Sequence, residues 1–404
     1  MKHIPAMKPM GSFMKIWQYP ENLGKRDLRV DFIRGFVMLI LIVVHIDIFS
    51  LYNFIAWERL GAVTGAEGFV MLSGAILGLL SRVGIHEEDG LGKTVTKQFS
   101  RAFLLYRTSL VVIISIAVLN IFIDASAVMT FTTYAGKVYN LYPDFAVFQQ
   151  YQDRIIAKFV MLRYGPHQFQ ILGLYVVLLM FSPFILWSLA KKQVLTVLTI
   201  SWLIYLGNSG FHVRPTGAQF EYAFPILSWQ VLFVHGLVIG FYRNEIWNFF
   251  HSRKGAIVFA FILAIYLLLL FFTYNNPLSG KIPDYMRLHV IDADTFKSIY
   301  EQYFRKNTLG LGRLLNDFAM LFVSYALLSY FWKPMNKALG WFFIPIGQAS
   351  LYVFILHVYA CIVIANIVWF QEGDMFVNTL AHSLVFLFMW LMVKYKVAFN
   401  IIPR

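Results

Sequence analysis

The stretch Arg29–Phe49, RVDFIRGFVMLILIVVHIDIF, predicts the fold of this chain. Charged residues open it, and a solid apolar run over residues 36–44 follows. His45 and Asp47 come next, at a depth where a helix of membrane length would still be in lipid, because about 20 apolar residues cross the hydrocarbon. Arg34 and His45 are about three helical turns apart, so they share one face and lie roughly 16 Å apart along the axis. This alignment predicts a polar path along a membrane helix.

The composition indicates a polytopic membrane protein. Of the 404 residues, 59% are hydrophobic and 14% are charged, whereas a soluble domain carries about 25% charge. The single cysteine, Cys361, excludes an intramolecular disulfide framework. The net charge of +13 comes without a nucleic-acid recognition motif. We therefore expect no nucleic-acid partner and attribute the basic residues to membrane topology.

The apolar stretches predict an all-α transmembrane helix bundle. Ten reach membrane length, near residues 30–52, 61–82, 103–124, 168–190, 193–209, 224–242, 256–275, 316–333, 342–369 and 377–396. Short connecting segments rich in Lys and Arg lie on the cytoplasmic side of a membrane protein. Their distribution along this chain predicts that both ends of the chain are inside. We expect a cytoplasmic basic leader (1–29), a transmembrane domain (30–396) and a cytoplasmic tail (397–404).

Two outer loops, 125–167 and 276–315, are long enough to suggest a function. Both mix aromatic with polar residues, and each contains a plausible amphipathic helix, over Phe145–Leu162 and Asp294–Phe304. Such a mixture is typical of carbohydrate-binding surfaces, and it is also typical of the aromatic belt at a membrane interface.

Two ionisable residues within the spans are candidates for catalysis. His45 is one, because a neutral imidazole accepts a proton near pH 7. Glu67 is the other, because a carboxylate that orients an imidazole makes it a base. The alternative for His45 is a single hydrogen bond to a neighbouring helix. The alternative for Arg34 is a membrane anchor, in which its side chain extends to the inner surface of the membrane. Asp31, one turn earlier, can pair with Arg34.

Further polar groups within the spans are candidates for lining a substrate pocket, although each alone fits a buried hydrogen bond as well. They are Ser73, Tyr175, Trp229, Gln230, Gln348, Tyr352 and His357. Small residues beside Ser73 favour close helix packing. The chain carries no motif for a metal site or for nucleotide hydrolysis, so we expect no metal.

Five phrases resemble a known family. The first span opens with D-x-x-R-G and continues R-x10-H, from Arg34 to His45, which resembles the membrane acyltransferase-3 superfamily. RDLRVDFIRG, AEGFVMLSGAILG, LGLYVVLLMFSP, WQVLFVHGLVIGF and GQASLYVFILH resemble its OpgC branch, in order, from about residue 26 to 390. Gln170 departs from the pattern, since an acidic residue is expected there, and no esterase domain follows.

The resemblance implies ten spans, a base at His45 and a matching arginine at Arg34. It implies transfer of a succinyl or related acyl group to a periplasmic glucan. We therefore expect acyl-CoA, succinyl-CoA or acetyl-CoA, as donor, a glucan or other polysaccharide as acceptor, and a bacterial inner-membrane location among lipids. The candidates for binding the donor phosphates are Arg34, Lys93, Lys97, Arg101 and Arg107.

Several alternatives stay open at this point. Direct attack and a transient acyl-histidine both fit, as does acetylation of another polysaccharide. A transporter or flippase that moves a glycan or lipid unchanged is the competing class, and the sequence shows neither of its cues, inverted repeats and paired broken helices. A structural scaffold is a third reading. The sequence leaves the oligomeric state undecided.

Overall fold

The computed structural model describes residues 18–20, 26–46, 48–87, 90–122, 131–134, 137–143, 145–277, 282–367 and 374–404. Asp47 and most of the basic leader lie outside these ranges. Apart from turns and irregular connections, the described part is helical, with the exception of an antiparallel hairpin in which β1 (Phe131–Tyr134) pairs with β2 (Lys137–Asn140). This hairpin lies in the first long loop and is the one departure from the predicted all-α fold in the described ranges.

The helices follow one another along the chain with short connections. In chain order they are α2 (Leu28–Ile46), η1 (Leu51–Phe54), α3 (Gly65–Glu87), α4 (Gly90–Phe122), α6 (Phe145–Gln150), α7 (Gln152–Val160), η2 (His167–Phe169), α8 (Ile171–Ala190), α9 (Val194–Phe211), α10 (Phe220–Ala223), α11 (Ile226–Phe241), α12 (Arg243–Phe250), α13 (Arg253–Tyr274), η3 (Asp284–Met286), α14 (Ala293–Tyr303), α15 (Leu311–Tyr330), α16 (Trp332–Met335), η4 (Asn336–Gly340), α17 (Trp341–Gln348), α18 (Ser350–Ala365) and α20 (Met375–Lys394).

The length and apolar composition of these helices identify a multi-pass membrane protein. In the described ranges seven helices are long and apolar enough to cross a membrane, and the number rises to nine if each of two bent helix pairs is one span. Each of the ten predicted spans coincides with a helix or a bent pair. The first, α2, is not among the nine, because three charged residues stand in its first two turns.

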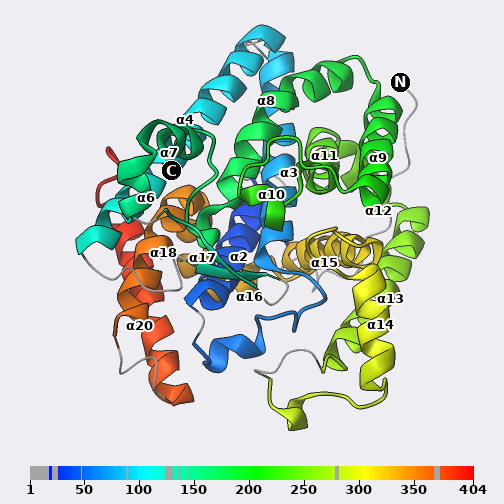
Figure 1. Cartoon of the computed structure of the whole chain (residues 1–404). Helices are drawn as coiled ribbons and strands as arrows, with labels where there is room; N and C mark the ends of the chain where they lie inside the picture. The colour runs from blue at the N-terminus through cyan, green and yellow to red at the C-terminus, as the bar shows by residue number, and fades with distance from the viewer. Residues whose placement is uncertain are drawn as a thin grey trace.

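Helix α2 lies near the centre of the bundle, with α20 towards one edge of the view and α13 and α14 towards the other (Figure 1). Its contact with α17 is unusually close. A Cβ atom added at Gly35 would lie 2.0 Å from the Phe343 carbonyl oxygen, and one at Gly347 would lie 1.8 Å from the Asp31 carbonyl oxygen. The glycine of the D-x-x-R-G phrase therefore lets α17 pack backbone to backbone against α2.

Helices α3 and α11 form a second close contact through two G-x-x-x-G pairs. Added Cβ atoms at Gly74 and Gly78 would lie 2.3 and 2.0 Å from carbonyl oxygens of α11. Those at Gly236 and Gly240 would lie 2.1 and 1.8 Å from carbonyl oxygens of α3. Small residues at four-residue spacing are a standard means of close helix packing in membranes.

Several predicted boundaries were wrong. The connection between the predicted spans 61–82 and 103–124 is mostly helix, because α3 continues to Glu87 and α4 begins at Gly90 and runs for 33 residues. The stretch 342–369 is two helices that meet at an 88° bend near Ala349. The amphipathic helix expected over Phe145–Leu162 is divided into α6 and α7, whereas α14 agrees with the expected Asp294–Phe304.

Candidate active site

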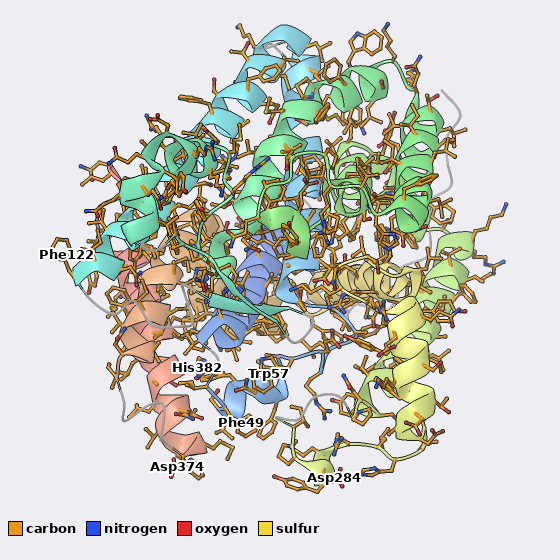
Figure 2. The ribbon with its side chains drawn as sticks, in the orientation of Figure 1. Phe49, Trp57, Phe122, Asp284, Asp374 and His382 are labelled. Atoms are coloured by element: carbon orange, nitrogen blue, oxygen red, sulfur yellow. The ribbon has the colours of Figure 1, made fainter. Side chains whose placement is uncertain are left out.

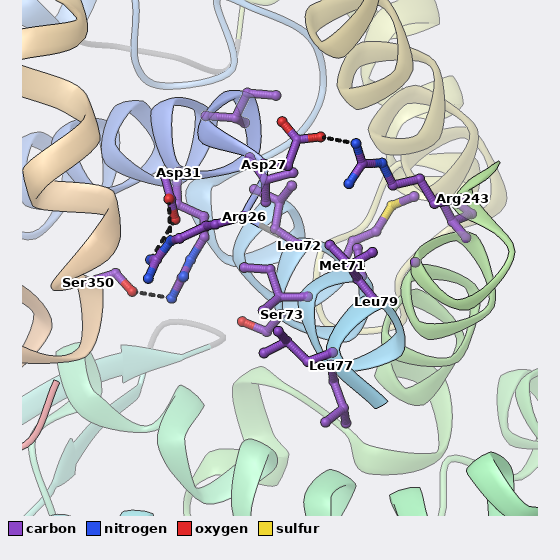
Figure 3. A pocket seen from close by; sticks show the side chains of 18 of the residues that line it. Arg26, Asp27, Asp31, Met71, Leu72, Ser73, Leu77, Leu79, Arg243 and Ser350 are labelled. Atoms are coloured by element: carbon purple, nitrogen blue, oxygen red, sulfur yellow. Dashed lines mark hydrogen bonds and ion pairs between the residues drawn. The ribbon is translucent and has the colours of Figure 1, made fainter. Parts of the chain in front are cut away.

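A large cavity opens inside the bundle beside the first half of α2. Its volume is about 1480 Å³, more than the 300–1,000 Å³ of ordinary ligand pockets. Its lining runs along α3 from Phe69 to Gly84, which corresponds to roughly 22 Å of helix. Figure 3 shows Arg26, Asp31 and Ser350 gathered on one side and Asp27 with Arg243 on another, with Leu72, Ser73 and Leu77 of α3 between them.

The cavity lining is strongly cationic. Eight Lys and Arg side chains and two Asp side chains contribute to it, namely Arg26, Arg34, Lys97, Arg101, Arg243, Lys394, Lys396 and Arg404 against Asp27 and Asp31. Five of the cations, Arg34, Arg101, Lys394, Lys396 and Arg404, form no ion pair with a carboxylate of the described residues. Such a lining suits an elongated anionic ligand.

The guanidinium of Arg34 points to the bend between α17 and α18. Its Nη2 donates to Ser350 Oγ, and its Nε is buried without a hydrogen-bond partner. The predicted pair of Asp31 with Arg34 was wrong. Asp31 instead accepts two hydrogen bonds from Arg26, at 2.6 and 2.9 Å, and a longer one from Gln348, at 3.4 Å. Arg34, which lines the cavity, therefore keeps N–H groups with which it can bind a ligand.

Asp27 holds the start of α2 in place through several partners. It pairs with Arg29 at 2.8 Å and with Arg243 at 3.2 Å, and it accepts a hydrogen bond from Tyr325 at 2.7 Å. Burial by itself would raise the pKa of the Asp27 carboxyl, but Arg29 and Arg243 hold it below the ordinary value. This carboxylate therefore stays charged and fixes one wall of the cavity.

The two histidines of α2 and α18 form a hydrogen-bonded pair. His45 Nδ1 lies 2.9 Å from His357 Nε2, and the rings stack with centroids 5.1 Å apart. His357 Nδ1 contacts the carbonyl oxygen of Phe354, which can only accept, so this nitrogen carries the proton. In the neutral pair His357 Nε2 is then the acceptor and His45 Nδ1 the donor. This assignment leaves the lone pair of His45 on Nε2, free to take a proton.

A layer of aromatic rings separates this histidine pair from the cavity. Phe69 lines the cavity and stacks on Phe354, with ring centroids 6.0 Å apart. Phe354 also packs against Phe169, at 5.3 Å, and against His357, at 4.8 Å. Neither His45 nor His357 lines the cavity. One ring, that of Phe354, therefore stands between the deep end of the cavity and the histidines.

Glu67 does not contact His45, so the expected orienting role was wrong. Its carboxylate accepts from Arg313 Nε at 2.5 Å and from the Thr64 amide at 3.0 Å, and both charged side chains are fully buried. Arg313 also donates to Glu58, at 2.8 Å. Burial and the Glu58 carboxylate raise the pKa of Tyr300, which donates to that carboxylate as a neutral phenol. This network ties α3, α14 and α15 together.

The remaining predicted site residues divide into two groups. Five more, Ser73, Tyr175, Lys97, Arg101 and Gln348, line the cavity with Arg34 and Asp31, whereas Lys93 and Arg107 do not.

Three of the expected pocket residues make other contacts. Gln230 exchanges hydrogen bonds with Ser201 of α9, Trp229 is buried against Phe224, and the Tyr352 hydroxyl donates to the Val397 carbonyl at 2.7 Å. All three placements argue against direct substrate contact.

The sequence reasoning missed five cavity cations: Arg26, Arg243, Lys394, Lys396 and Arg404. They had been counted only as positive charges at an inner surface. It also missed Arg313, which had been assigned to a loop. A buried carboxylate such as Glu67 needs a cation as partner, and that requirement is the signal that could have found Arg313.

An aromatic pair lies at the end of α2 away from the cavity. Phe49 and Trp57 have ring centroids 6.2 Å apart, and Figure 2 shows them at the end of the molecule where Asp284 and Asp374 also lie. Trp57 and Glu58 both have positive φ angles, of 48° and 62°, a conformation that residues with a Cβ adopt rarely. Such strained residues often mark functional surfaces.

Comparison with known families agrees with this geometry. A family model described as "OpgC protein" matches residues 26–400. The chain belongs to the OpgC family. A search of the curated proteins found no match. The OpgC match begins at Arg26, at the start of the cavity lining, and ends within the segment that follows α20, so it includes both the cavity and the histidine pair.

Proposed function

We propose that this OpgC-family protein is a membrane O-acyltransferase. It would move a succinyl or similar acyl group from cytosolic acyl-CoA to hydroxyls of a periplasmic or extracytoplasmic glucan, across a bacterial inner membrane spanned ten times with both ends inside. Family membership fits a membrane glucan-modifying enzyme and suggests acyltransferase activity. The observation that carries the proposal is the cationic cavity whose deep end, at Phe69, is one ring away from the His45–His357 pair.

In this proposal the donor lies along the cavity. Arg34 and Arg101 bind its phosphates, since guanidinium groups recognise phosphate oxygens through parallel hydrogen bonds. The pantetheine arm follows α3 past Ser73 and Tyr175, and the thioester reaches the aromatic layer. Phe354 must turn aside for the thioester to meet His45, so the layer keeps water from the thioester until then.

The chemistry follows from the tautomers of the pair. His45 Nε2 takes the proton of a sugar hydroxyl while the hydroxyl oxygen attacks the thioester carbonyl carbon. The C–S bond then breaks, and the CoA sulfur leaves with the proton from His45. The neutral His357 accepts the Nδ1 proton of His45 throughout, which holds the ring in place and stabilises its protonated state. Attack by His45 itself, through an acyl-histidine, uses the same residues.

The test is transfer from radiolabelled succinyl-CoA and acetyl-CoA in inverted and right-side-out vesicles. We expect label in lumenal glucan of inverted vesicles with one donor, and none with His45→Ala. His382→Gln is the matched control, because His382 is also a buried histidine but contacts neither His45 nor His357. Unchanged transfer by a well-expressed His45→Ala variant would remove His45 as the base.

A transporter or flippase of a glycan or lipid is the second candidate, and one observation favours it. Two helix pairs, α11 with α12 and α17 with α18, are bent by 78° and 88°, and broken helices are typical of transporters. Movement of unmodified glucan into vesicles, with no label taken from either CoA thioester, would favour this candidate over the acyltransferase.

A further inference from the structure

Helix α3 divides the cavity, because two of its faces line different parts of it. Ser73 belongs to the face towards Tyr175 of α8, and a second face, at four-residue spacing, carries only apolar side chains. Figure 3 shows Met71 and Leu79 of this second face on the side of Arg243. We call the part of the cavity beside them the α12 compartment. It is lined by Met71, Ala75 and Leu79 of α3, Trp247 and Phe250 of α12, and Phe322 of α15.

Helix α12 closes one end of this compartment. It follows α11 after a bend of 78°. Ile246, Trp247 and Phe250 of α12 line the cavity, whereas Asn244 and Asn248 on its other side are exposed. A short helix with one apolar and one polar face, next to a membrane span, is typical of a helix that lies in the membrane surface. The compartment therefore has its closed end at the depth of the lipid headgroups.

The walls of the compartment are apolar, and aromatic contacts hold them together. Phe250 packs on Phe322 with ring centroids 4.4 Å apart, and Trp247 packs against Tyr325 at 6.1 Å. The charged side chain that α12 contributes, Arg243, is paired with Asp27. An apolar compartment stays dry and binds apolar ligands. This part of the cavity therefore suits hydrocarbon and not a sugar or a nucleotide.

The helix beside the compartment is exposed to lipid along much of its length. Phe259 of α13 lines the cavity, and the neighbouring Ile257 and Phe261 are 71% and 66% exposed. In a membrane protein such exposed apolar side chains face hydrocarbon chains. Lipid is therefore present at the edge of the compartment.

Two cations are placed to select the headgroup of such a lipid. Arg253 and Lys254 are exposed, and they lie between His251 and Ala256, which both line the cavity. Neither forms an ion pair with a carboxylate in the part of the chain that the structure describes. Basic pockets between membrane helices bind the headgroups of anionic lipids.

We propose that the α12 compartment binds a hydrocarbon chain of an anionic phospholipid, and that Arg253 and Lys254 bind the phosphate of its headgroup. The lipid holds α12 against α15 and, through the ion pair of Arg243 with Asp27, supports the start of α2. This site is separate from the proposed acyl transfer, and it is expected whether the protein transfers an acyl group or transports a glycan.

The experiment measures binding of radiolabelled phosphatidylglycerol, which is anionic, and phosphatidylcholine, which has no net charge, to the purified full chain in detergent. The first test variant is Ala326→Phe, because Ala326 lines the cavity one helical turn from Phe322 and the new ring takes the place of the chain. We expect the affinity for both lipids to fall about tenfold or more, since the burial of two CH₂ groups already corresponds to that factor.

The second test variant combines Arg253→Gln with Lys254→Gln. We expect its affinity for phosphatidylglycerol to fall about tenfold, because each cation near an anionic headgroup contributes several-fold. Its affinity for phosphatidylcholine should equal that of the wild type. The two variants therefore differ in which lipid they lose.

Each test variant has a matched control. Ala264→Phe adds the same ring on an exposed part of α13, and Lys191→Gln with Lys192→Gln removes two exposed cations between α8 and α9; none of these residues lines the cavity. Both controls should bind both lipids as the wild type does. Equal weakening in the controls would mean that lipid only coats the outer surface, and unchanged affinities in Ala326→Phe would remove the compartment as the chain site.

The variant without Arg253 and Lys254 keeps the inference testable if Ala326→Phe does not fold, because both of its changes are at exposed positions. An unchanged preference for phosphatidylglycerol in this variant would overturn the inference. Lipid binding is measured without a donor or an acceptor, so its failure would leave the proposed acyltransferase function untouched.

Discussion

His45 Nδ1 and His357 Nε2 lie 2.9 Å apart although 312 positions separate them in the sequence. The Phe354 carbonyl fixes the tautomer of His357, and His357 fixes the tautomer of His45. A backbone acceptor thus determines which nitrogen of His45 is available as a base. This chain of hydrogen bonds resembles a catalytic triad in its logic, with an imidazole in the place of the carboxylate.

Replacing His357 should reduce the chemical step and leave donor binding intact. In His357→Leu the Nδ1 proton of His45 loses its acceptor, so the ring can take the wrong tautomer. We expect kcat to fall about 10²-fold, within the range that a general base contributes, with KM for acyl-CoA unchanged. Steady-state kinetics on purified protein measures both values. His357→Gln, whose amide oxygen can accept the same proton, should recover part of the loss, and a rise in KM alone would contradict this role.

Removing the ring of Phe354 should connect the cavity to the histidines. In Phe354→Ala, water reaches a bound thioester, so we expect hydrolysis of acyl-CoA without glucan to rise several-fold. Release of free CoA thiol measures it. Phe233→Ala removes another fully buried ring, on α11, which lines the cavity but does not lie between it and the histidines, and controls for loosened packing. Equal hydrolysis in the two variants would show that Phe354 has no special role as a barrier.

Glu67→Gln should destabilise the protein instead of changing its chemistry. The substitution leaves the buried Arg313 charge with Glu58 alone as carboxylate partner among the described residues, and breaking a buried pair costs at most about 3–5 kcal/mol. The thermal unfolding midpoint in detergent should fall accordingly. Glu245→Gln breaks a half-exposed pair with Arg82 and should cost at most about 1 kcal/mol. A Glu67→Gln variant with normal stability and no activity would restore the catalytic role predicted from the sequence.

Trp57→Ala should weaken binding of the glucan acceptor. Sugar rings bury apolar surface on aromatic faces, and loss of one large ring should raise KM for glucan about tenfold. KM for acyl-CoA should not change, because Trp57 does not line the cavity. Tyr285→Ala removes an isolated ring that is 85% exposed and serves as control. If both variants behave like the wild type in glucan titrations, the acceptor binds elsewhere.

The sequence was sufficient to predict where the helices lie and how residues on the same helix are placed relative to one another. Arg34 and His45 lie on the continuous helix α2 because an uninterrupted apolar run joins them. The bend at Ala349 was not predicted, because the mean hydropathy of the stretch stays high even though Pro345, Gln348 and Ser350 interrupt the apolar run there. Hydropathy measures how well a segment suits lipid and carries no information about its direction.

Partners between helices could not be predicted from the sequence. Glu67 was expected beside His45 because both were ionisable groups in neighbouring spans. Its partner Arg313 was assigned to a loop, because charged and polar residues in the first turns of α15 lower the local hydropathy, although the helix begins at Leu311. His357 was recognised as a candidate, but helix packing decides which polar groups meet. Residues 395–404 show no hydrophobic periodicity, so nothing in the sequence indicated that they line the cavity.

The glycine contacts of α3 and α11 also determine which parts of the cavity can move. At Gly74, Gly78, Gly236 and Gly240 the two backbones already touch, so neither helix can come closer, and sliding one along the other would drive carbonyl groups into the opposite chain. The α3–α11 pair is therefore expected to move as one rigid unit. Any change in the shape of the cavity must therefore come from its other sides, which include α4, α8 and residues 394–404, and a donor can enter only where those sides move apart.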